Sequence, residues 1–293
     1  MEERIDAVVA LGMFDGMHLG HRALIARTVD HAKKLDASPV VFTFSNHPAE
    51  VLGGRVRLLS TPQERTQIMK DLGIADVRML AFTREFAALS PEKFVERMCD
   101  LWRVRAFVVG FNYSFGDHGR GTPQMLAEMG KAYGFTVDII PPVMDDGEAV
   151  SSTRIRNALE NGDVQLASRM LARPYQLTGK VIANRRIGRK IGFPTANITV
   201  DAHRVLPKPG VYMTNAVTED GKVYRGVTNI GTNPTVGGKK TSVETHLLGF
   251  DGDLYGEVLQ ILFLERIRGE IRFDSLDELK RQIDSDAKWA AAR

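Results

Sequence analysis

The sequence predicts an α/β protein in which a parallel sheet flanked by helices is followed by a small β-barrel with a C-terminal helix. As far as about residue 172, short β-branched runs alternate with amphipathic helical patterns, which is typical of βαβ units. Beyond residue 173, glycine-punctuated strands replace the helices. Helical spacing returns only in residues 275–292, where Leu276, Leu279 and Ile283 share one face.

In the first domain, which we expect to span residues 1–173, strands and helices should alternate. The expected strands cover residues 5–11, 40–44, 77–82, 107–109 and 135–140. Thr61 and Glu64 have the spacing of a helix capping box, and Ser90 and Thr122 are each followed by proline, as at helix starts. Because the strands of βαβ units are parallel, ligands should lie beyond their carboxyl ends.

The second domain is expected to span residues 174–293 and to be rich in strands. Alternating runs over residues 211–217 and 223–227 predict two strands, and Asp220-Gly221 predicts the turn between them. A small barrel closed by the C-terminal helix is the simplest interpretation of this pattern. No internal repeat is visible in either domain.

Composition excludes several classes of protein. With 43% hydrophobic and 26% charged residues, the chain has an ordinary globular composition. Its longest apolar runs are far shorter than the ~20 residues that cross a bilayer. The net charge of +3 comes from basic residues scattered among acidic ones, which is no nucleic-acid footprint. One cysteine, Cys99, and a start without signal-peptide features predict a cytoplasmic protein.

The loop after the first strand carries two histidines among three glycines. Gly12, Gly16 and Gly20 surround His18 and His21, and a helix is expected to follow at once. Helix starts present free amides and a partial positive charge to phosphate, and residues three apart project from one face. Two imidazoles facing one phosphate suit nucleotidyl transfer. The alternative is a surface turn with two solvated histidines, which this strand–loop–helix context disfavours.

Other loops at the same sheet edge add polar groups. Asn112 follows a strand and suits either recognition of a base or ribose or a backbone cap. Ser152 and Arg156 lie at a helix start, which suits a clamp on the β- and γ-phosphates or an ordinary N-cap with solvated basic side chains. We expect these loops to converge on one crevice.

In the second domain, two glycines frame a basic loop that ends in a hydroxyl and an amide. Gly188, Lys190 and Gly192 precede Thr195 and Asn197. On an extended segment the last two side chains point to the same side, so together they suit Mg²⁺ bound to ATP. The spacing does not match a Walker motif, so a P-loop fold has no support.

Farther along, Glu244 is an acid in an otherwise apolar strand. A carboxylate beside a bound alcohol suits the general base of a kinase. From the residues alone, an outward-facing glutamate on an edge strand is the more favoured interpretation, because glutamate is usually exposed.

The chain resembles the bifunctional riboflavin kinase/FAD synthetase family of bacteria over nearly its whole length. Residues 12–21 and 151–156 look like the two adenylyltransferase signatures of that family. Residues 192–197, 210–212, 229–231, 234–235 and 253–256 look like its riboflavin kinase half, in the same order. The resemblance implies a Rossmann-like nucleotidyltransferase domain followed by a riboflavin kinase barrel. It further implies that ATP, riboflavin and FMN are the small-molecule substrates and that Mg²⁺ is the cofactor.

The resemblance also implies roles for individual residues. In the adenylyltransferase, His18 and His21 would be catalytic, and the ATP-binding residues would be Gly12, Phe14, Asp15, Gly16, Asn112, Ser152 and Arg156. In the kinase, Glu244 would be the base, and ATP would be bound by Gly188, Lys190, Gly192, Thr195 and Asn197, the last two also holding the metal. One departure is visible at Ser45 and Asn46, where many members carry an acid followed by proline.

Two rival functions are compatible with the same motifs. One is a nucleotidyltransferase for another small phosphate or alcohol, such as phosphopantetheine or glycerol phosphate, with an unrelated barrel appended. The other is a flavin sensor that binds but does not turn over, although a pure binder would not need the base that Glu244 provides. The sequence does not predict the oligomeric state.

Overall fold

The computed structural model describes residues 4–183, 192–235 and 238–293 of the chain. These residues form two compact units, Met1–Ser152 and Thr153–Arg293. The domain boundary expected at residue 173 stays a prediction. None of the helices in the described ranges is long and apolar enough to cross a membrane.

The first unit is built on a parallel sheet with the strand order β3-β2-β1-β4-β5, which confirms the expected α/β architecture. Its strands are β1 (Asp6–Leu11), β2 (Ser38–Phe44), β3 (Asp76–Leu80), β4 (Arg103–Gly110) and β5 (Thr136–Ile140). Its helices are α1 (Leu19–Lys34), α2 (Pro48–Val51), α3 (Pro62–Asp71), α4 (Arg84–Ala87), α5 (Pro91–Leu101) and α6 (Pro123–Tyr133). A 3-10 turn, η1 (Asp117–Gly119), and a short hairpin of β6 (Met144–Asp145) and β7 (Glu148–Ala149) complete the unit.

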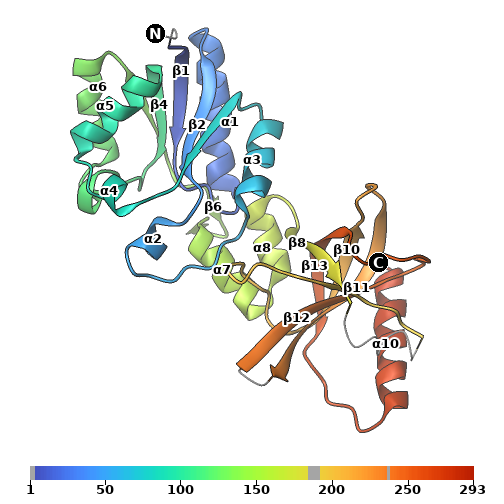
Figure 1. Cartoon of the computed structure of the whole chain (residues 1–293). Helices are drawn as coiled ribbons and strands as arrows, with labels where there is room; N and C mark the ends of the chain where they lie inside the picture. The colour runs from blue at the N-terminus through green and yellow to red at the C-terminus, as the bar shows by residue number, and fades with distance from the viewer. Residues whose placement is uncertain (1–3, 184–191, 236–237) are drawn as a thin grey trace. The chain divides into compact units, whose positions relative to one another are not determined.

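Helices cover both faces of this sheet (Figure 1). Along β1, Val8 and Ala10 pack in one core with Ile25 of α1 and Met69 of α3. The alternate residues of β1 pack in a second core with residues of α5 and α6, which are Phe94, Val95, Met98 and Leu126. A strand that is apolar on both faces is characteristic of a parallel sheet covered on both sides. The capping box of α3 is present as expected, with Thr61 and Glu64 each bonding to the other's backbone N–H.

The second unit begins with two helices and continues as a closed antiparallel barrel. The helices are α7 (Ser152–Asn161), whose first residue belongs to the first unit, and α8 (Val164–Leu171). The barrel strands pair in the order β10-β11-β12-β9-β8-β13 and then back to β10. They are β8 (Tyr175–Ile182), β9 (Ala196–Ile198), β10 (Gly210–Val217), β11 (Val223–Thr235), β12 (Gly238–Leu247) and β13 (Val258–Arg268).

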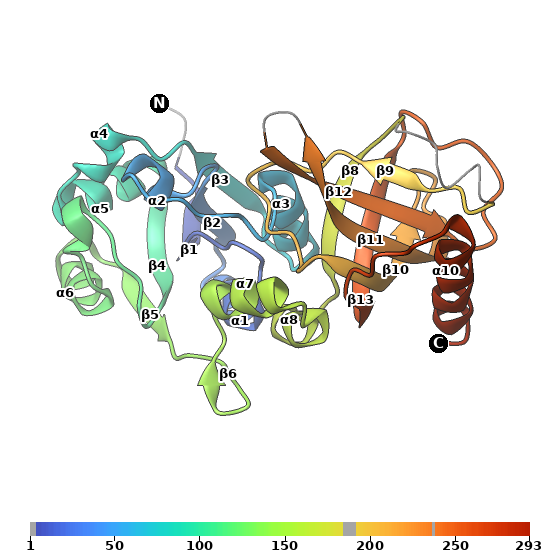
Figure 2. The same cartoon turned by 90° about the horizontal axis from the view of Figure 1, so that it is seen from below.

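The final helix, α10 (Leu276–Ala291), packs along the outside of the barrel beside β11 (Figure 2). Ala290 is fully buried against Val211, Met213 and Val227. Leu276, expected to share the apolar face, is 65% exposed. It begins the helix, and the buried positions of α10 lie nearer its other end.

A buried ion pair fastens α10 to the barrel. Arg268 at the end of β13 donates from Nε and Nη2 to the carboxylate of Asp286, with the shortest bond at 2.8 Å. The Asp286 side chain is 4% exposed and also accepts a bond from Gln282. Removing one member of such a pair leaves the other desolvated and without its counter-charge.

We therefore expect Asp286→Ala to lower the free energy of unfolding of the barrel unit by about 2–3 kcal/mol. Chemical denaturation followed by tryptophan fluorescence, in a Trp102→Phe background so that Trp289 of the barrel unit gives the signal, would measure the change. Asp284→Ala, which removes an exposed pair with Lys288 on the same helix, should cost less than about 1 kcal/mol. Equal losses in the two variants would contradict the assignment of this anchor.

Candidate active sites

The strand order of the first unit has its switch in direction between β1 and β4. These two strands are neighbours, yet the chain continues from β1 to one side of the sheet and from β4 to the other. In open α/β sheets, ligands bind outside the carboxyl ends of the strands at this switch in direction. The loop that begins at Gly12 follows β1, and the loop that carries Asn112 follows β4. The two loops expected to converge therefore leave adjacent strands.

The loop after β1 has an unusual backbone. Gly16 has φ +83°, but Phe14 and Met17 also have positive φ, at +54° and +50°. Both of these side chains are fully buried. A non-glycine residue in this region costs of order 1–3 kcal/mol, so their packing must hold the loop in place. Such strain is concentrated at ligand sites.

The two histidines of the loop stack on one another. His18 is the N-cap of α1, and its Nδ1 accepts a 3.3 Å bond from the backbone N–H of His21. The ring centroids are 3.7 Å apart at 18°, and the Phe14 ring packs edge-on against His21 at 5.3 Å. His18 is 7% exposed. The spacing of three residues thus brings both imidazoles to the helix start, as predicted.

His21 is neutral at neutral pH. Burial lowers the pKa of its imidazole well below 6.5, and repulsion from His18 and Arg65 lowers the pKa further. Its Nδ1 is buried and has no hydrogen-bond partner among the described residues. A buried polar atom without a partner usually marks a site for a ligand or water.

Gly20 provides the space that the His18 ring occupies. A Cβ on Gly20 would lie 3.1 Å from Cε1 and 3.2 Å from Nδ1 of that ring. The ring cannot yield easily, because His21 stacks on its other side. A side chain at position 20 would therefore require the His18 ring to move.

Gly20→Ala is expected to slow the nucleotidyl transfer that the sequence predicts for this loop by roughly tenfold, or ~1.4 kcal/mol in the barrier, because the added methyl group displaces the His18 ring. Alanine favours a helix over glycine by ~0.8–1 kcal/mol, which offsets the cost of crowding the His18 ring, so the net change in stability should be small. Steady-state rates of the transfer predicted for this loop, with thermal unfolding as the control, would check both points. An undiminished rate would show that His18 need not keep this position.

Asp15, expected to bind ATP, directs its carboxylate to the protein. It is 2% exposed and accepts bonds from the backbone N–H groups of Leu59 and Ser60. The Ser60 hydroxyl in turn accepts a bond from Gly16 N–H at 2.9 Å. Ser152 donates its hydroxyl to the Asp15 carbonyl oxygen, also at 2.9 Å. The side chains of Asp15 and Ser152 thus hold the loop from two directions.

Arg65 is a supporting residue that the sequence did not reveal. This fully buried arginine of α3 donates to the carbonyl oxygens of Met13 at 2.8 Å and Phe44 at 2.6 Å. It therefore ties the loop after β1 to the end of β2. In the sequence it is simply a basic residue in an amphipathic helix, so no pattern identifies it.

The departure at Ser45 and Asn46 has a structural explanation. The Asn46 amide bonds to both backbone groups of Phe82, at 3.0 and 2.7 Å. Ser45 N–H donates to the Leu80 carbonyl oxygen at 2.8 Å. These residues tie the loop after β2 to the loop after β3.

Two other predicted ATP contacts are not tested by the structure. Asn112 is exposed after β4, and Arg156 lies one turn beyond Ser152 on α7. Their roles in ATP binding stay predictions.

In the barrel, strand pairing brings together the predicted base and one predicted metal ligand. β12 lies between β11 and β9, and Glu244 stands directly across from Asn197. The two side chains are hydrogen-bonded, and Ser242 bonds to Glu244 as well. The expectation of an edge strand is therefore wrong, because a closed barrel has no edge at β12.

Burial alters the electrostatics of Glu244. Burial raises the pKa of its carboxyl above 4.5, against the opposing effect of hydrogen bonds from Ser242 and Asn197. A raised pKa brings a carboxylate closer to the operating pH, where proton transfer is most efficient.

The other predicted kinase residues lie before β9. Thr195 is partly buried just before this strand, and Gly192 is exposed with φ +87°. Gly188 and Lys190 lie outside the described residues.

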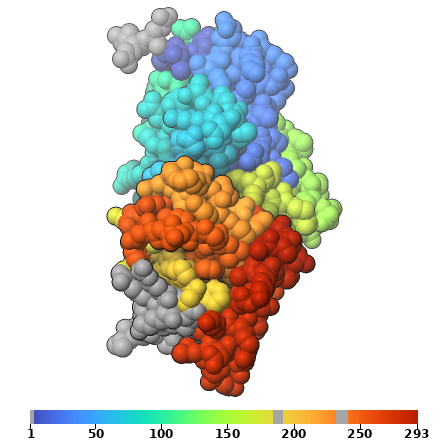
Figure 3. Space-filling view, turned by 90° about the vertical axis from the view of Figure 1, so that its right-hand side faces the viewer, coloured from blue at the N-terminus to red at the C-terminus, as the bar shows by residue number. Residues whose placement is uncertain are grey.

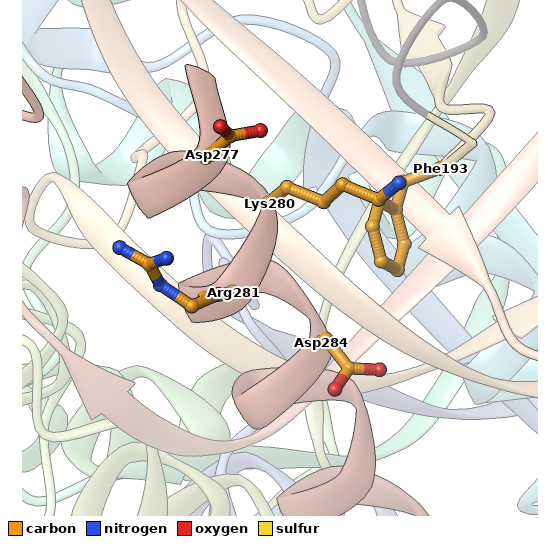
Figure 4. Close-up of a pocket in the computed structure, with 5 residues that line it drawn as sticks. All are labelled: Phe193, Asp277, Lys280, Arg281 and Asp284. Atoms are coloured by element: carbon orange, nitrogen blue, oxygen red, sulfur yellow. The ribbon is translucent and has the colours of Figure 1, made fainter. Parts of the chain in front are cut away.

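A pocket opens beside the segment that follows Gly192. Phe193 forms one wall, and the other wall is the first half of α10 (Figure 4). Lys280 extends from the helix toward Phe193. The remaining side chains of the lining are Asp277, Arg281 and Asp284. An aromatic wall facing both signs of charge suits a flat ligand with a phosphate or hydroxylated tail.

The fold and these two sites together define a two-part nucleotide-dependent transferase. The family model described as FAD synthetase matches residues 1–154, and the one described as riboflavin kinase matches residues 171–293. The chain belongs to the bifunctional riboflavin kinase/FMN adenylyltransferase family.

Curated relatives and a solved structure agree with this membership. The enzyme of Bacillus subtilis is 37% identical, over 99% of this chain and 93% of its own length. The enzyme of Pseudomonas fluorescens is 39% identical over the same shares. A crystal structure described as a macrolide-efflux protein from Streptococcus pneumoniae superposes with a TM-score of 0.91 at 32% identity, covering 99% of this chain and 95% of that one.

Proposed function

We propose that the chain carries out the two reactions of its family at separate sites, one in each unit. The barrel transfers the γ-phosphoryl group of ATP to riboflavin, giving FMN and ADP. The first unit joins FMN to the adenylyl group of a second ATP, giving FAD and pyrophosphate. The observation that carries the proposal is the pairing of Glu244 with Asn197 in one unit and of His18 with His21 in the other.

In the barrel, Glu244 acts as the general base. Its carboxylate takes the proton of the terminal ribityl hydroxyl as that oxygen bonds to the γ-phosphorus, and the bond to the β–γ bridging oxygen breaks. Asn197 holds the carboxylate in place through the bond between them. Gly188, Lys190 and Gly192 are proposed ATP contacts on the strength of the family signature.

Thr195 and Asn197 are proposed to hold Mg²⁺. A hydroxyl and an amide oxygen are the hard oxygen donors that this ion accepts. Among the described residues, no group of three or more His, Cys, Asp or Glu side chains could hold a metal. The phosphates of ATP would supply further oxygen ligands to the ion. When bound, the ion neutralises charge on the phosphates.

In the first unit, His18 and His21 act as hydrogen-bond donors. FMN attacks through a phosphate oxygen that is already ionised, so the transfer requires no base. Attack at the α-phosphorus places charge on its non-bridging oxygens and on the departing pyrophosphate, and N–H donors beside them stabilise that charge. We propose that the loop residues Gly12, Phe14, Asp15 and Gly16, with Asn112, Ser152 and Arg156, surround the ATP.

The proposal is tested by supplying riboflavin, ATP and Mg²⁺ to the purified chain and separating the flavins over time. FMN should appear first and FAD should follow. Flavin binding without ADP or pyrophosphate release would instead indicate a sensor. Nucleotidyl transfer to phosphopantetheine without flavin binding would indicate the rival transferase.

The cytoplasmic location expected from the composition remains a prediction.

A further inference from the structure

His246 contacts the segment that carries the proposed metal ligands. It lies two residues beyond Glu244 on β12, and its Nδ1 is 2.8 Å from the Pro194 carbonyl oxygen. The His246 and Phe193 rings meet edge to face, with their centroids 5.4 Å apart. One side chain therefore bonds to the backbone of this segment and packs on its aromatic residue.

The hydrogen bond fixes the tautomer of His246. A carbonyl oxygen can only accept, so Nδ1 must carry a hydrogen, and in the neutral ring Nε2 is then the unprotonated nitrogen. Nδ1 carries a hydrogen in the charged ring as well. The contact with Pro194 is thus available in either charge state, and its role does not depend on pH.

The described part of the segment before β9, residues 192–195, lies outside the ladders that join β9 to β12 and to β8. β9 is only three residues long, and its ladder to β12 starts with Ala196 opposite Thr245. Pro194 has no N–H to donate. In Figure 3, part of the yellow region of the chain that includes this segment is visible at the surface. The bond between Pro194 and His246 therefore extends the connection between this segment and β12 beyond the ladder.

The pairing puts His246 on the same face of β12 as Glu244. Alternate residues of a strand share a face, and Glu244 faces Asn197 across the ladder. Thr195 lies two residues before Asn197 and directly follows Pro194, whose carbonyl oxygen accepts the bond from His246. The antiparallel pair thus sets Thr195 and Asn197 against His246 and Glu244.

We propose that His246 is a positioning residue of the kinase: by holding the Pro194 carbonyl, it sets where Thr195 stands relative to Glu244. The inference rests on the proposed kinase site, and it concerns how tightly that site binds nucleotide rather than the proton transfer itself. If His246 had a purely structural role, it would stabilise the barrel without affecting how the chain binds nucleotide.

His246→Ala, His246→Asn and His246→Gln separate these roles. The asparagine amide can place an N–H near the position of Nδ1, whereas the longer glutamine places one near Nε2. We expect the alanine and glutamine variants to bind ADP with Mg²⁺ about tenfold more weakly, which is ~1.4 kcal/mol, and asparagine to restore most of the affinity. Titration calorimetry on the full-length chain measures this without turnover.

A second readout needs no ligand. Hydrogen exchange of peptides within residues 192–198 should be faster in His246→Ala than in the wild type, and near normal in His246→Asn. FAD formation from added FMN should not change, and His203→Ala, which removes an exposed histidine of the same unit, should leave both readouts unchanged.

The outcomes distinguish this inference from the proposed site. If His246→Ala binds ADP and exchanges hydrogen as the wild type does, while Glu244→Gln has lost kinase activity, the inference is overturned and the site stands. If Glu244→Gln keeps kinase activity, the proposed site itself fails. If all three His246 variants lose stability and affinity equally, the structural role is the correct one.

Discussion

Glu244→Gln is expected to slow riboflavin phosphorylation by roughly 10²–10⁴-fold, the usual contribution of a general base, and to leave FMN adenylylation unchanged. Glutamine keeps the size of the side chain and can still bond to Asn197 and Ser242, but it cannot take a proton. Rates of FMN formation from riboflavin, and of FAD formation from added FMN, measure the two reactions in one preparation.

The same variant should not unfold. Burial raises the pKa of Glu244 in the folded chain. The unfolded chain therefore loses this proton at a lower pH, and the free energy of unfolding decreases as the pH rises past the ordinary glutamate value. Glutamine removes that penalty, and the barrel should be equally or more stable at neutral pH. Glu265→Gln, a partly buried carboxylate on β13, should affect neither the kinase rate nor stability. A kinase rate within a few-fold of wild type in Glu244→Gln would rule out Glu244 as the base.

The pH profile gives an independent check on the base. Only the ionised carboxylate accepts a proton, so kcat/KM for riboflavin should fall as the pH drops through the raised pKa of Glu244. The acidic limb should therefore lie above 4.5, the ordinary value. It should be absent from the residual activity of Glu244→Gln.

The juxtaposition of the two histidines was predictable because its signals are local. The strand that ends before Gly12, the glycines and the pair His18 and His21 all lie within one short stretch of sequence. A helix brings residues three apart to one face, and a parallel sheet brings loops to one edge. These rules are enough to place both histidines, and the structure confirms that they meet.

What sequence patterns missed depends on contacts between distant segments. Glu244 and Asn197 are adjacent only because β12 pairs with β9 in a closed barrel, and a single strand does not show its partner. Without the family resemblance, the exposed edge-strand interpretation was therefore favoured. Arg65 likewise looks like a solvated helix residue until α3 packs under the loop after β1. Asp15 faces Leu59 and Ser60 for the same reason.

His21→Ala is expected to reduce FAD formation from FMN by roughly 10²–10³-fold, the cost of removing one donor from developing negative charge, with riboflavin phosphorylation intact. Rates with saturating FMN and ATP would measure the loss. His31→Ala, on the same helix, tests whether the effect belongs to the position: its ring bonds to Asp138, so it should reduce stability and leave the rate nearly unchanged. Equal rate losses in the two variants would remove His21 from the site.

The neutral state of His21 gives this prediction a second readout. Because the folded-state pKa lies well below 6.5, the unfolded chain binds a proton more readily as the pH falls below that value. His21 therefore makes the free energy of unfolding decrease in acid, from about pH 6.5 down to its own folded pKa. His21→Asn should flatten that part of the stability curve, and an unchanged slope would show that the imidazole is not held neutral by burial and by the nearby Arg65.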